Sequence, residues 1–237
     1  METRIKTEVS SLVQRIQSVE GKPFWPDETV TSSVLNVILR ILVGSSFDKE
    51  TLKDIISSIH SFVHDTVAAV GVHFCPVLRY WPPYWRVLMR AIDYHNRIFE
   101  HVAKLISSCT SDSFIKYYVD REASELDSEQ LNYVVRDLLL AGTETSASML
   151  LWSVAVLANH PSVQTKMQQE IDSVLPQRRL PSLSDKPHLP YVEATMLEIM
   201  RFKTVVPLAL AHRTVSDTKV GEFIIPADTL VTTVSMY

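Results

Sequence analysis

Apolar residues recur at helical spacing along most of the chain. Residues 2–20 carry them three and four positions apart, with charged side chains on the opposite face, which predicts an amphipathic helix. A regular helix does not accommodate the prolines of residues 74–85, so an apolar loop is expected there. The same helical period predicts further helices over the ranges 27–44, 49–69, 85–108 and 112–122.

A longer helical run follows, and then the period changes. Residues 128–160 contain no proline, and their middle is almost uncharged except for Glu144, which predicts a helix through the centre of a large fold. Proline-started helices are expected over 161–175 and 190–203, with a loop between them. Beyond Pro207 the period shifts towards two, which predicts short strands over 209–215, 218–225 and 230–236. The expected fold class is therefore mainly α, with a long central helix and a few short C-terminal β-strands.

Composition and charge remove several classes of protein. The chain of 237 residues has 5 glycines, and this scarcity argues against glycine-rich phosphate loops and turn-dense all-β folds. A net charge of −4 gives no footprint for a nucleic-acid partner. The 2 cysteines, Cys75 and Cys109, cannot build a disulfide scaffold or a cysteine-rich metal site, and they are compatible with a reducing compartment.

Segments that would direct the chain to a membrane are not expected. Residues 1–20 are charged and lack the apolar core of a signal peptide. The most apolar candidate, residues 30–43, is broken by Asn36 and Arg40, and a bilayer span needs about 18 apolar residues in a row. The sequence therefore predicts no transmembrane segment in this chain.

The first candidate for chemistry is the segment Ala141-Gly142-Thr143-Glu144-Thr145-Ser146 on the long helix. Gly142 costs about 1 kcal/mol against alanine in a helix, and the Thr145 hydroxyl can compete for a backbone carbonyl. Together with the lone acid Glu144, they suggest a loosened helix where a ligand could approach and a proton could be relayed. The alternative is a glycine needed for helix–helix packing beside a back-bonded threonine.

Two further candidates lie downstream. Glu198 and Arg201 stand at i and i+3 on one helix face, so they can pair; apolar neighbours suggest burial, and the alternative is a solvated surface pair. Residues 207–213 lead from small apolar side chains to His212 and Arg213. They could form a pocket wall that ends at an anion site, or an edge strand with two exposed bases.

Other catalytic motifs are missing from the sequence. His60 and His64 stand at i and i+4 without a glutamate between them, so a surface or packing role is favoured over metal binding. There is no Gly-x-Ser-x-Gly elbow, Walker loop or Cys-x-x-Cys pair.

In their order and spacing these motifs resemble the cytochrome P450 family of haem-thiolate monooxygenases, in particular the microsomal animal branch that includes steroid and fatty-acid hydroxylases. The resemblance is specific over residues 137–237 and looser over 1–136, where residues 40–48 look like a helix end of that branch that closes on Phe-Asp. It rests on the segment 141–146, Asn159-His160-Pro161, Glu170-Ile171, Glu198-Ile199-Met200-Arg201, Pro207 and His212.

The resemblance implies roles for these residues. Glu144 and Thr145 would be the acid–threonine pair that helps to deliver protons to dioxygen above the haem. Ala141 and Gly142 would lie beside the haem, and His212 would reach a haem propionate. Glu198 and Arg201 would be a structural lock behind the haem. The substrate pocket would be lined by Ala141, Val205, Val206, Leu208 and Leu210.

One part of the family pattern is not found. The iron ligand of the family is a cysteine in a Phe-x-x-Gly-x-x-x-Cys-x-Gly loop, and neither Cys75 nor Cys109 has that context. Residues 1–237 are therefore expected to be one partial cytochrome P450 domain, the central part of that fold, without the membrane anchor and the haem-cysteine loop.

By this resemblance the intact protein would be a monooxygenase. It would use haem, dioxygen and electrons from an NADPH-dependent reductase to hydroxylate an apolar steroid, fatty acid or xenobiotic, at the endoplasmic reticulum or mitochondrial membrane. The chain alone would be inactive and would not bind haem stably. The alternative is a non-enzymatic helical protein that retains only the family's packing. A metal hydrolase is a remote third, because ligand spacing is lacking.

Overall fold

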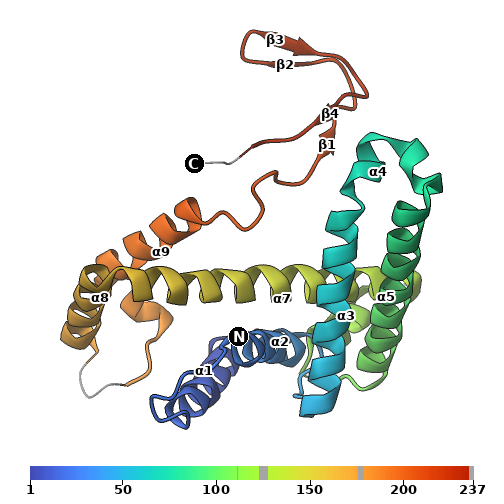
Figure 1. The fold of residues 1–237 in the computed structure, drawn as a ribbon. Helices are drawn as coiled ribbons and strands as arrows, with labels where there is room; N and C mark the ends of the chain where they lie inside the picture. Colours follow the sequence, from blue (N-terminus) through green and yellow to red (C-terminus); the bar gives the residue numbers. More distant parts are fainter. Residues whose placement is uncertain (111, 123–127, 176–178, 235–237) are drawn as a thin grey trace. The chain divides into compact units, whose positions relative to one another are not determined.

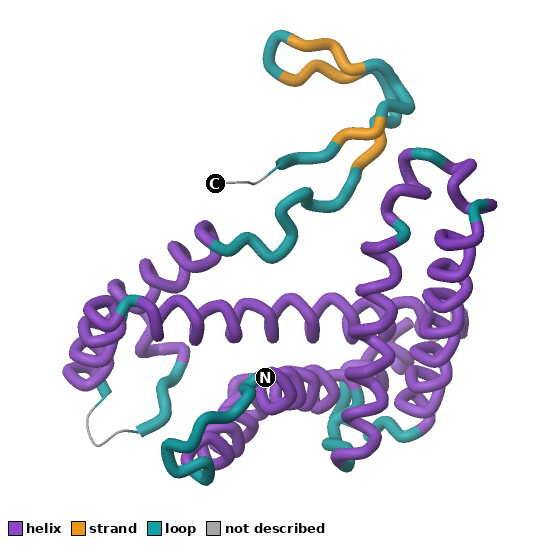
Figure 2. The backbone as a smooth tube through the Cα atoms, viewed as in Figure 1, coloured by secondary structure: helices purple, strands orange, loops and turns teal. Residues whose placement is uncertain are grey.

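The computed structural model describes residues 1–110, 112–122, 128–175 and 179–234. The chain divides into two compact units, Met1–Leu151 and Trp152–Tyr237. Helices make up most of the first unit, and the second combines helices with short strands (Figure 2). The mainly α class is therefore confirmed, and the expectation of one partial domain stays a prediction.

The N-terminal unit is built of helices, most of which are labelled in Figure 1. Most of the long helix α7 belongs to it, and α3 and α5 pack side by side. Asp48 begins α3 by accepting hydrogen bonds from the backbone N–H groups of Glu50 and Thr51, and these bonds lower the pKa of its carboxyl. The helices are α1 (Glu2–Gln17), α2 (Asp27–Leu42), α3 (Lys49–Ala68), α4 (Val70–Phe74), α5 (Pro82–Ser107), α6 (Phe114–Glu122) and α7 (Ser128–Asn159).

One cluster of buried apolar residues holds this unit together. Each helix that contributes places apolar side chains three and four positions apart on its inner face, as the sequence pattern predicted. α7 contributes only its N-terminal half, through Leu131, Val135 and Leu139. The other members are Leu35, Leu39, Leu42 and Val43 around α2, Leu52, Ile55 and Ile59 of α3, Ile98, Val102 and Leu105 of α5, and Ile115 of α6.

The segment 74–85 is not the irregular loop that the sequence predicted. A 3-10 helix, Pro76–Tyr80, occupies its centre, and α5 already begins at Pro82. Proline is tolerated at these places because the first turn of a helix leaves its N–H groups without intrahelical partners. The prolines therefore begin two helical elements here.

The C-terminal unit contains two more long helices joined by a short 3-10 helix. They are α8 (Pro161–Val174), η3 (Leu183–His188) and α9 (Pro190–Phe202). The carboxylate of Glu170 in α8 accepts the backbone N–H groups of Tyr191 and Val192 at 2.9 and 2.8 Å. Because these N–H groups belong to the first turn of α9, Glu170 caps that helix and fixes it against α8.

Among the residues of this unit that the structure describes, the strands are β1 (His212–Arg213), β2 (Thr218–Val220), β3 (Phe223–Ile225) and β4 (Leu230–Val231). β1 pairs with β4 and β2 with β3, both antiparallel. The single strand expected over 218–225 is wrong, because Gly221 takes a φ of 59° and turns the chain into a hairpin. The strand expected over 209–215 is reduced to β1, and the strand expected over 230–236 is reduced to β4, with residues 235–236 outside the described residues.

Candidate functional site

The middle of α7 carries the segment that the sequence singled out. The helix runs through it without a break, so the expected loosening is wrong. A Cβ on Gly142 would stand 2.9 Å from Cδ1 of Ile38 in α2, so the glycine lets the two helices approach closely. The Thr145 hydroxyl donates to the carbonyl oxygen of Ala141 at 2.7 Å. This is the local structure of the alternative interpretation, a packing glycine beside a back-bonded threonine.

Glu144 and Thr145 are both half-buried, whereas Ala141 is exposed. Oε2 of Glu144 is buried with Nε2 of His60 3.2 Å away, whereas the hydroxyl of the neighbouring Thr143 is buried without a hydrogen-bond partner. A buried oxygen without a partner is costly, so Thr143 marks a place where water or a ligand group would be favourable. This polarity agrees with a site on α7, although the pocket expected beside Glu144 and Thr145 stays a prediction.

A histidine that the sequence assigned to a surface or packing role faces this acid. Nε2 of His60 in α3 stands 3.2 Å from Oε2 of Glu144. The hydrogen-bonding interaction with Glu144 raises the pKa of His60, burial lowers it, and the charges of Glu144 and Asp27 raise it further, so the net shift is upward. Residue spacing within α3 could not predict this pair, because Glu144, the partner of His60, lies on α7, far away in the sequence.

In the C-terminal unit, Glu198 and Arg201 pair as the spacing predicted. Nε and a terminal guanidinium nitrogen of Arg201 donate to the two carboxylate oxygens of Glu198 at 2.7 and 2.5 Å, and these bonds lower the pKa of Glu198. The prediction that the pair is buried is wrong, since the side chains are 59% and 47% exposed. Their apolar neighbours Leu197 and Met200 are exposed too, and Ile199 is the neighbouring side chain that is buried.

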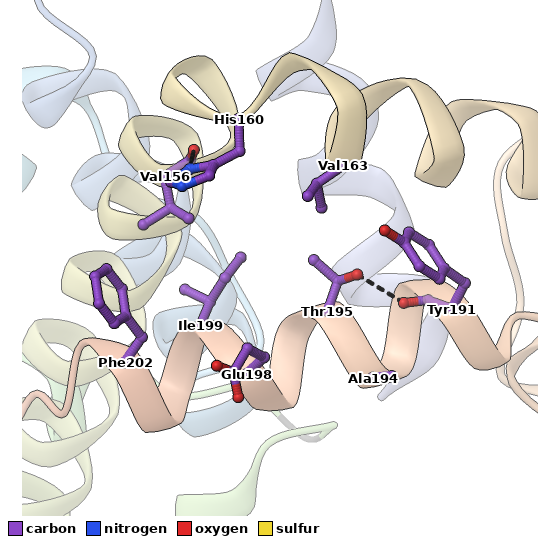
Figure 3. Close-up of a pocket in the computed structure, with 9 residues that line it drawn as sticks. All are labelled: Val156, His160, Val163, Tyr191, Ala194, Thr195, Glu198, Ile199 and Phe202. Carbon is purple, nitrogen blue, oxygen red and sulfur yellow. Dashed lines mark hydrogen bonds between the residues drawn. The ribbon is translucent and has the colours of Figure 1, made fainter. Parts of the chain in front are cut away.

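A pocket of about 450 Å³ lies between α9 and the helices before it (Figure 3). Glu198 borders it, and the Thr195 hydroxyl donates to the carbonyl oxygen of Tyr191 at 2.8 Å within its wall. The lining is otherwise largely apolar, so this pocket has few groups that could orient a polar ligand. Its residues are Val156, His160, Val163, Tyr191, Ala194, Thr195, Glu198, Ile199 and Phe202.

The residues expected to reach the haem and the substrate from this unit are largely exposed. His212 lies in β1, and the neighbouring Arg213 pairs with Asp228 at 2.7 Å. This is the arrangement of the alternative interpretation, an edge strand with exposed bases. Val205 is half-buried, while Val206, Leu208 and Leu210 are exposed. They belong to a different unit from Glu144 and Thr145, and their role as a pocket wall stays a prediction.

The comparisons with known proteins decide the family. The family model described as "Cytochrome P450" matches residues 1–237. The chain belongs to the cytochrome P450 family. It is 32% identical to cytochrome P450 2H2 of Gallus gallus, over 98% of this chain and 50% of that protein. It is 32% identical to cytochrome P450 2U1 of Mus musculus and 31% identical to cytochrome P450 1A1 of Rattus norvegicus, over 98% and 95% of this chain and 47% of each relative. The chain thus spans about half the length of the curated relatives it matches.

One helix of this cytochrome P450 bears on the membrane expectation. Residues Glu129–Asn159 form a helix that is long and apolar enough to cross a bilayer by length and composition, with 22% of its most apolar window buried. The core helix of a soluble protein meets the same criterion. The expectation that the chain contains no spanning segment is therefore not confirmed.

The family implies a haem, and the described residues fit one side of it. Exposed Ala141 leaves space on α7 beside the half-buried Glu144 and Thr145, where a flat apolar group can approach. Cys75 is exposed at the start of the 3-10 helix, and Cys109 packs against the N-terminal core. Within the described ranges, no group of three or more His, Cys, Asp or Glu side chains is arranged to hold a metal ion. Ala141, Glu144 and Thr145 are therefore the described residues that would lie beside the haem.

We expect Arg201→Ala to change the stability of the chain only slightly, because an exposed ion pair is screened by water. Ile199→Ala, two positions earlier on the same helix, is the matched control: Ile199 is 2% exposed, and its truncation should cost about 2–5 kcal/mol. Urea unfolding followed by circular dichroism measures both. Equal losses would mean that the guanidinium supports α9 as much as the buried side chain does.

We expect His60→Gln to remove a pH-dependent part of the stability. Because the pKa of His60 is raised above 6.5 in the folded chain, its stabilising contribution is complete below the unfolded value and is lost as the pH rises through the folded pKa. The difference in unfolding free energy between wild type and His60→Gln should therefore shrink with rising pH. His95 is a control for which the pH dependence should have the opposite sign. Burial and then the charge of Arg136 lower its pKa, so its contribution to the unfolding free energy should grow with rising pH. A difference for His60 that grows with pH would contradict this assignment.

Proposed function

We propose that the protein containing this chain is a haem-dependent monooxygenase that hydroxylates an apolar small molecule. The observation that carries the proposal is the acid–threonine pair Glu144–Thr145 in the middle of a long helix, in a chain matched throughout by the cytochrome P450 family model. The substrate class we propose is a steroid, a fatty acid or a xenobiotic. Electrons would come from an NADPH-dependent reductase, at the membrane of the endoplasmic reticulum or of the mitochondrion.

Haem with a thiolate ligand supplies the chemistry that activates dioxygen. The contribution of this chain is to bind, orient and transfer protons. Ala141 and Gly142 would let the cofactor approach α7, and His212 would hold a propionate. The Thr145 hydroxyl, now bonded to the Ala141 carbonyl, would rotate to donate its proton at the reacting centre. The half-buried Glu144, the preceding residue of the same helix, would then resupply that proton.

The substrate pocket would be apolar. Val205, Val206, Leu208 and Leu210 carry no polar side-chain atoms, and most of them are exposed in the C-terminal unit. Burying such side chains against a ligand is favourable by about 25 cal/mol for each Å² removed from water. A ligand without charged groups is therefore the class that this wall would take.

A second candidate is a helical protein without catalytic activity. It is favoured by the local packing of α7, where Ile38 accounts for Gly142 and the Ala141 carbonyl accounts for the Thr145 hydroxyl. The buried oxygens of Thr143 and Glu144 argue against it, because a helix kept for packing alone has no use for them. The substitution experiment below separates the two candidates.

We expect Thr145→Ala in the intact, haem-loaded protein to lower the rate of product formation on the order of 10²-fold, the usual scale for a lost acid–base group. Ser146→Ala is the matched control, since Ser146 is the exposed hydroxyl next in the chain. The measurement is hydroxylated product per reducing equivalent consumed, with a panel of apolar substrates. No product from the wild type would refute the enzyme, and equal yields from the two variants would remove Thr145 from the mechanism.

We also propose that residues 1–237 alone are not a competent monooxygenase and do not bind haem stably. Cys109 packs against the core, and Cys75 has no glycine-rich loop around it. Adding haem to the purified chain, reducing it and exposing it to carbon monoxide should give no Soret band of thiolate-ligated iron. Such a band, lost in Cys75→Ser or Cys109→Ser, would show that one of these cysteines binds the iron.

A further inference from the structure

His60 occupies a position between the acid of α7 and the solvent. One side of the imidazole faces Glu144, with Nε2 and Oε2 at 3.2 Å. The other side borders a polar hollow of about 380 Å³ between α3 and α5. The His60 side chain is 38% exposed, so it contacts both the solvent and the partly buried Glu144. The hollow is lined by His60, Ser61, His64, Asp65, Arg90 and Tyr94.

Charged side chains from α3 and α5 line the hollow and pair with each other. Asp65 is 4% exposed, and Nε and a terminal nitrogen of Arg90 donate to its two oxygens at 3.0 and 2.9 Å. Nδ1 of His64 stands 3.3 Å from the same carboxylate, while the His64 side chain itself is 80% exposed. A bidentate pair of this kind joins α3 to α5 in one geometry. The lining therefore carries polar and charged side chains and is reachable from solvent.

On the inner side, the carboxylate oxygen of Glu144 that faces His60 is shielded from solvent. Its side chain is 29% exposed, and Oε2 is buried. A carboxylate that resupplies protons must itself be reprotonated after each transfer. Because the imidazole stands against the buried oxygen and also borders the hollow, a proton can reach Oε2 through His60 without water entering the helix interface.

We propose that His60 is a positioning residue for the reaction, which holds Glu144 in place and reloads it with a proton drawn from the α3–α5 hollow. The proposal rests on the proposed function of the Glu144–Thr145 pair. In each cycle the imidazolium gives the Nε2 proton to Oε2 of Glu144 and becomes neutral. The neutral ring keeps its hydrogen on Nδ1, so it must rotate to bring the bare Nε2 to the hollow, where a hydronium ion protonates it and leaves as water, before the ring turns back to Glu144. One proton enters and one leaves, and no electrons move.

The charges around His60 suit this role. Asp27 of α2 and Glu144 of α7 both favour the protonated ring, and burial opposes it. From α5, Arg90 borders the hollow with its charge offset by Asp65, and Tyr94 borders it beside Arg90. On α3 itself, His64 is directed to Asp65. The pKa of His60 is thus raised above its usual value, first by its interaction with Glu144, which favours the protonated ring that a relay requires.

The first test uses the chain without haem. ¹³C-labelled histidine NMR should show a His60 pKa that falls in Glu144→Gln, because the carboxylate that raises it is gone. Asp54→Asn is the matched control, since Asp54 pairs with His101 at 3.2 Å and not with His60. An unchanged His60 titration in Glu144→Gln would overturn the proposal. This result does not depend on catalysis, so it stands apart from the proposed function.

The second test separates proton transfer from simple positioning, in the intact haem-loaded protein. His60→Gln keeps a hydrogen-bond donor but cannot titrate, and His60→Leu keeps neither property. Both should lower hydroxylated product per electron pair several-fold and release the remainder as peroxide, with an altered solvent isotope effect. If His60→Gln matches the wild type, the relay is refuted. If the wild type itself gives no product, the proposed function fails, whatever the NMR titration shows.

Discussion

The N-terminal unit depends on how α7 is buried. Its first half places Leu131, Val135 and Leu139 in the core shared with α2, α3 and α5. This packing fixes the rotation of the helix, because side chains three and four positions apart must all point inward. Once that rotation is set, the close approach of Ile38 to Gly142 and the inward direction of Thr143 follow from it. The position of Glu144 next to α3 is a further consequence, so the proposed chemistry depends on apolar contacts one to three turns away.

The polar groups of this unit are arranged around that apolar framework and do not replace it. Burying a carboxylate oxygen is unfavourable unless a partner compensates for the lost water. Glu144 finds that partner in His60 of α3, and Asp65 finds its own in Arg90 of α5. Both acids thus join neighbouring helices. Because α3 carries His60 and Asp65 less than two turns apart, the two ion pairs constrain the same stretch of that helix from both sides.

Much of the fold could be predicted from periodicity, and the errors have local physical causes. The bounds of α2 and α9 were predicted within a few residues. Apolar spacing indicates both helices, and Pro190 also marks the start of α9. The segment around Pro82 was misjudged because proline excludes a helix interior but favours a first turn. Gly221 was the overlooked signal of a hairpin. At the site, local spacing predicted the Glu198–Arg201 pair. It could not predict burial or the His60–Glu144 contact, which depend on elements brought together only by folding.

The acid and the threonine of α7 are held by interactions of very different range, and this difference bears on how they could work together. The Thr145 hydroxyl bonds to a carbonyl one turn away, a local contact with a net value of about 1 kcal/mol. Rotating it towards a bound ligand therefore costs little and disturbs no packing. Glu144 is held through α3, so moving it means breaking a contact between helices. In the proposed relay, the carboxylate of Glu144 would be the fixed member and would set where the proton waits. The hydroxyl of Thr145 would be the mobile member and would set when the proton is delivered, because only its local bond to the Ala141 carbonyl has to break.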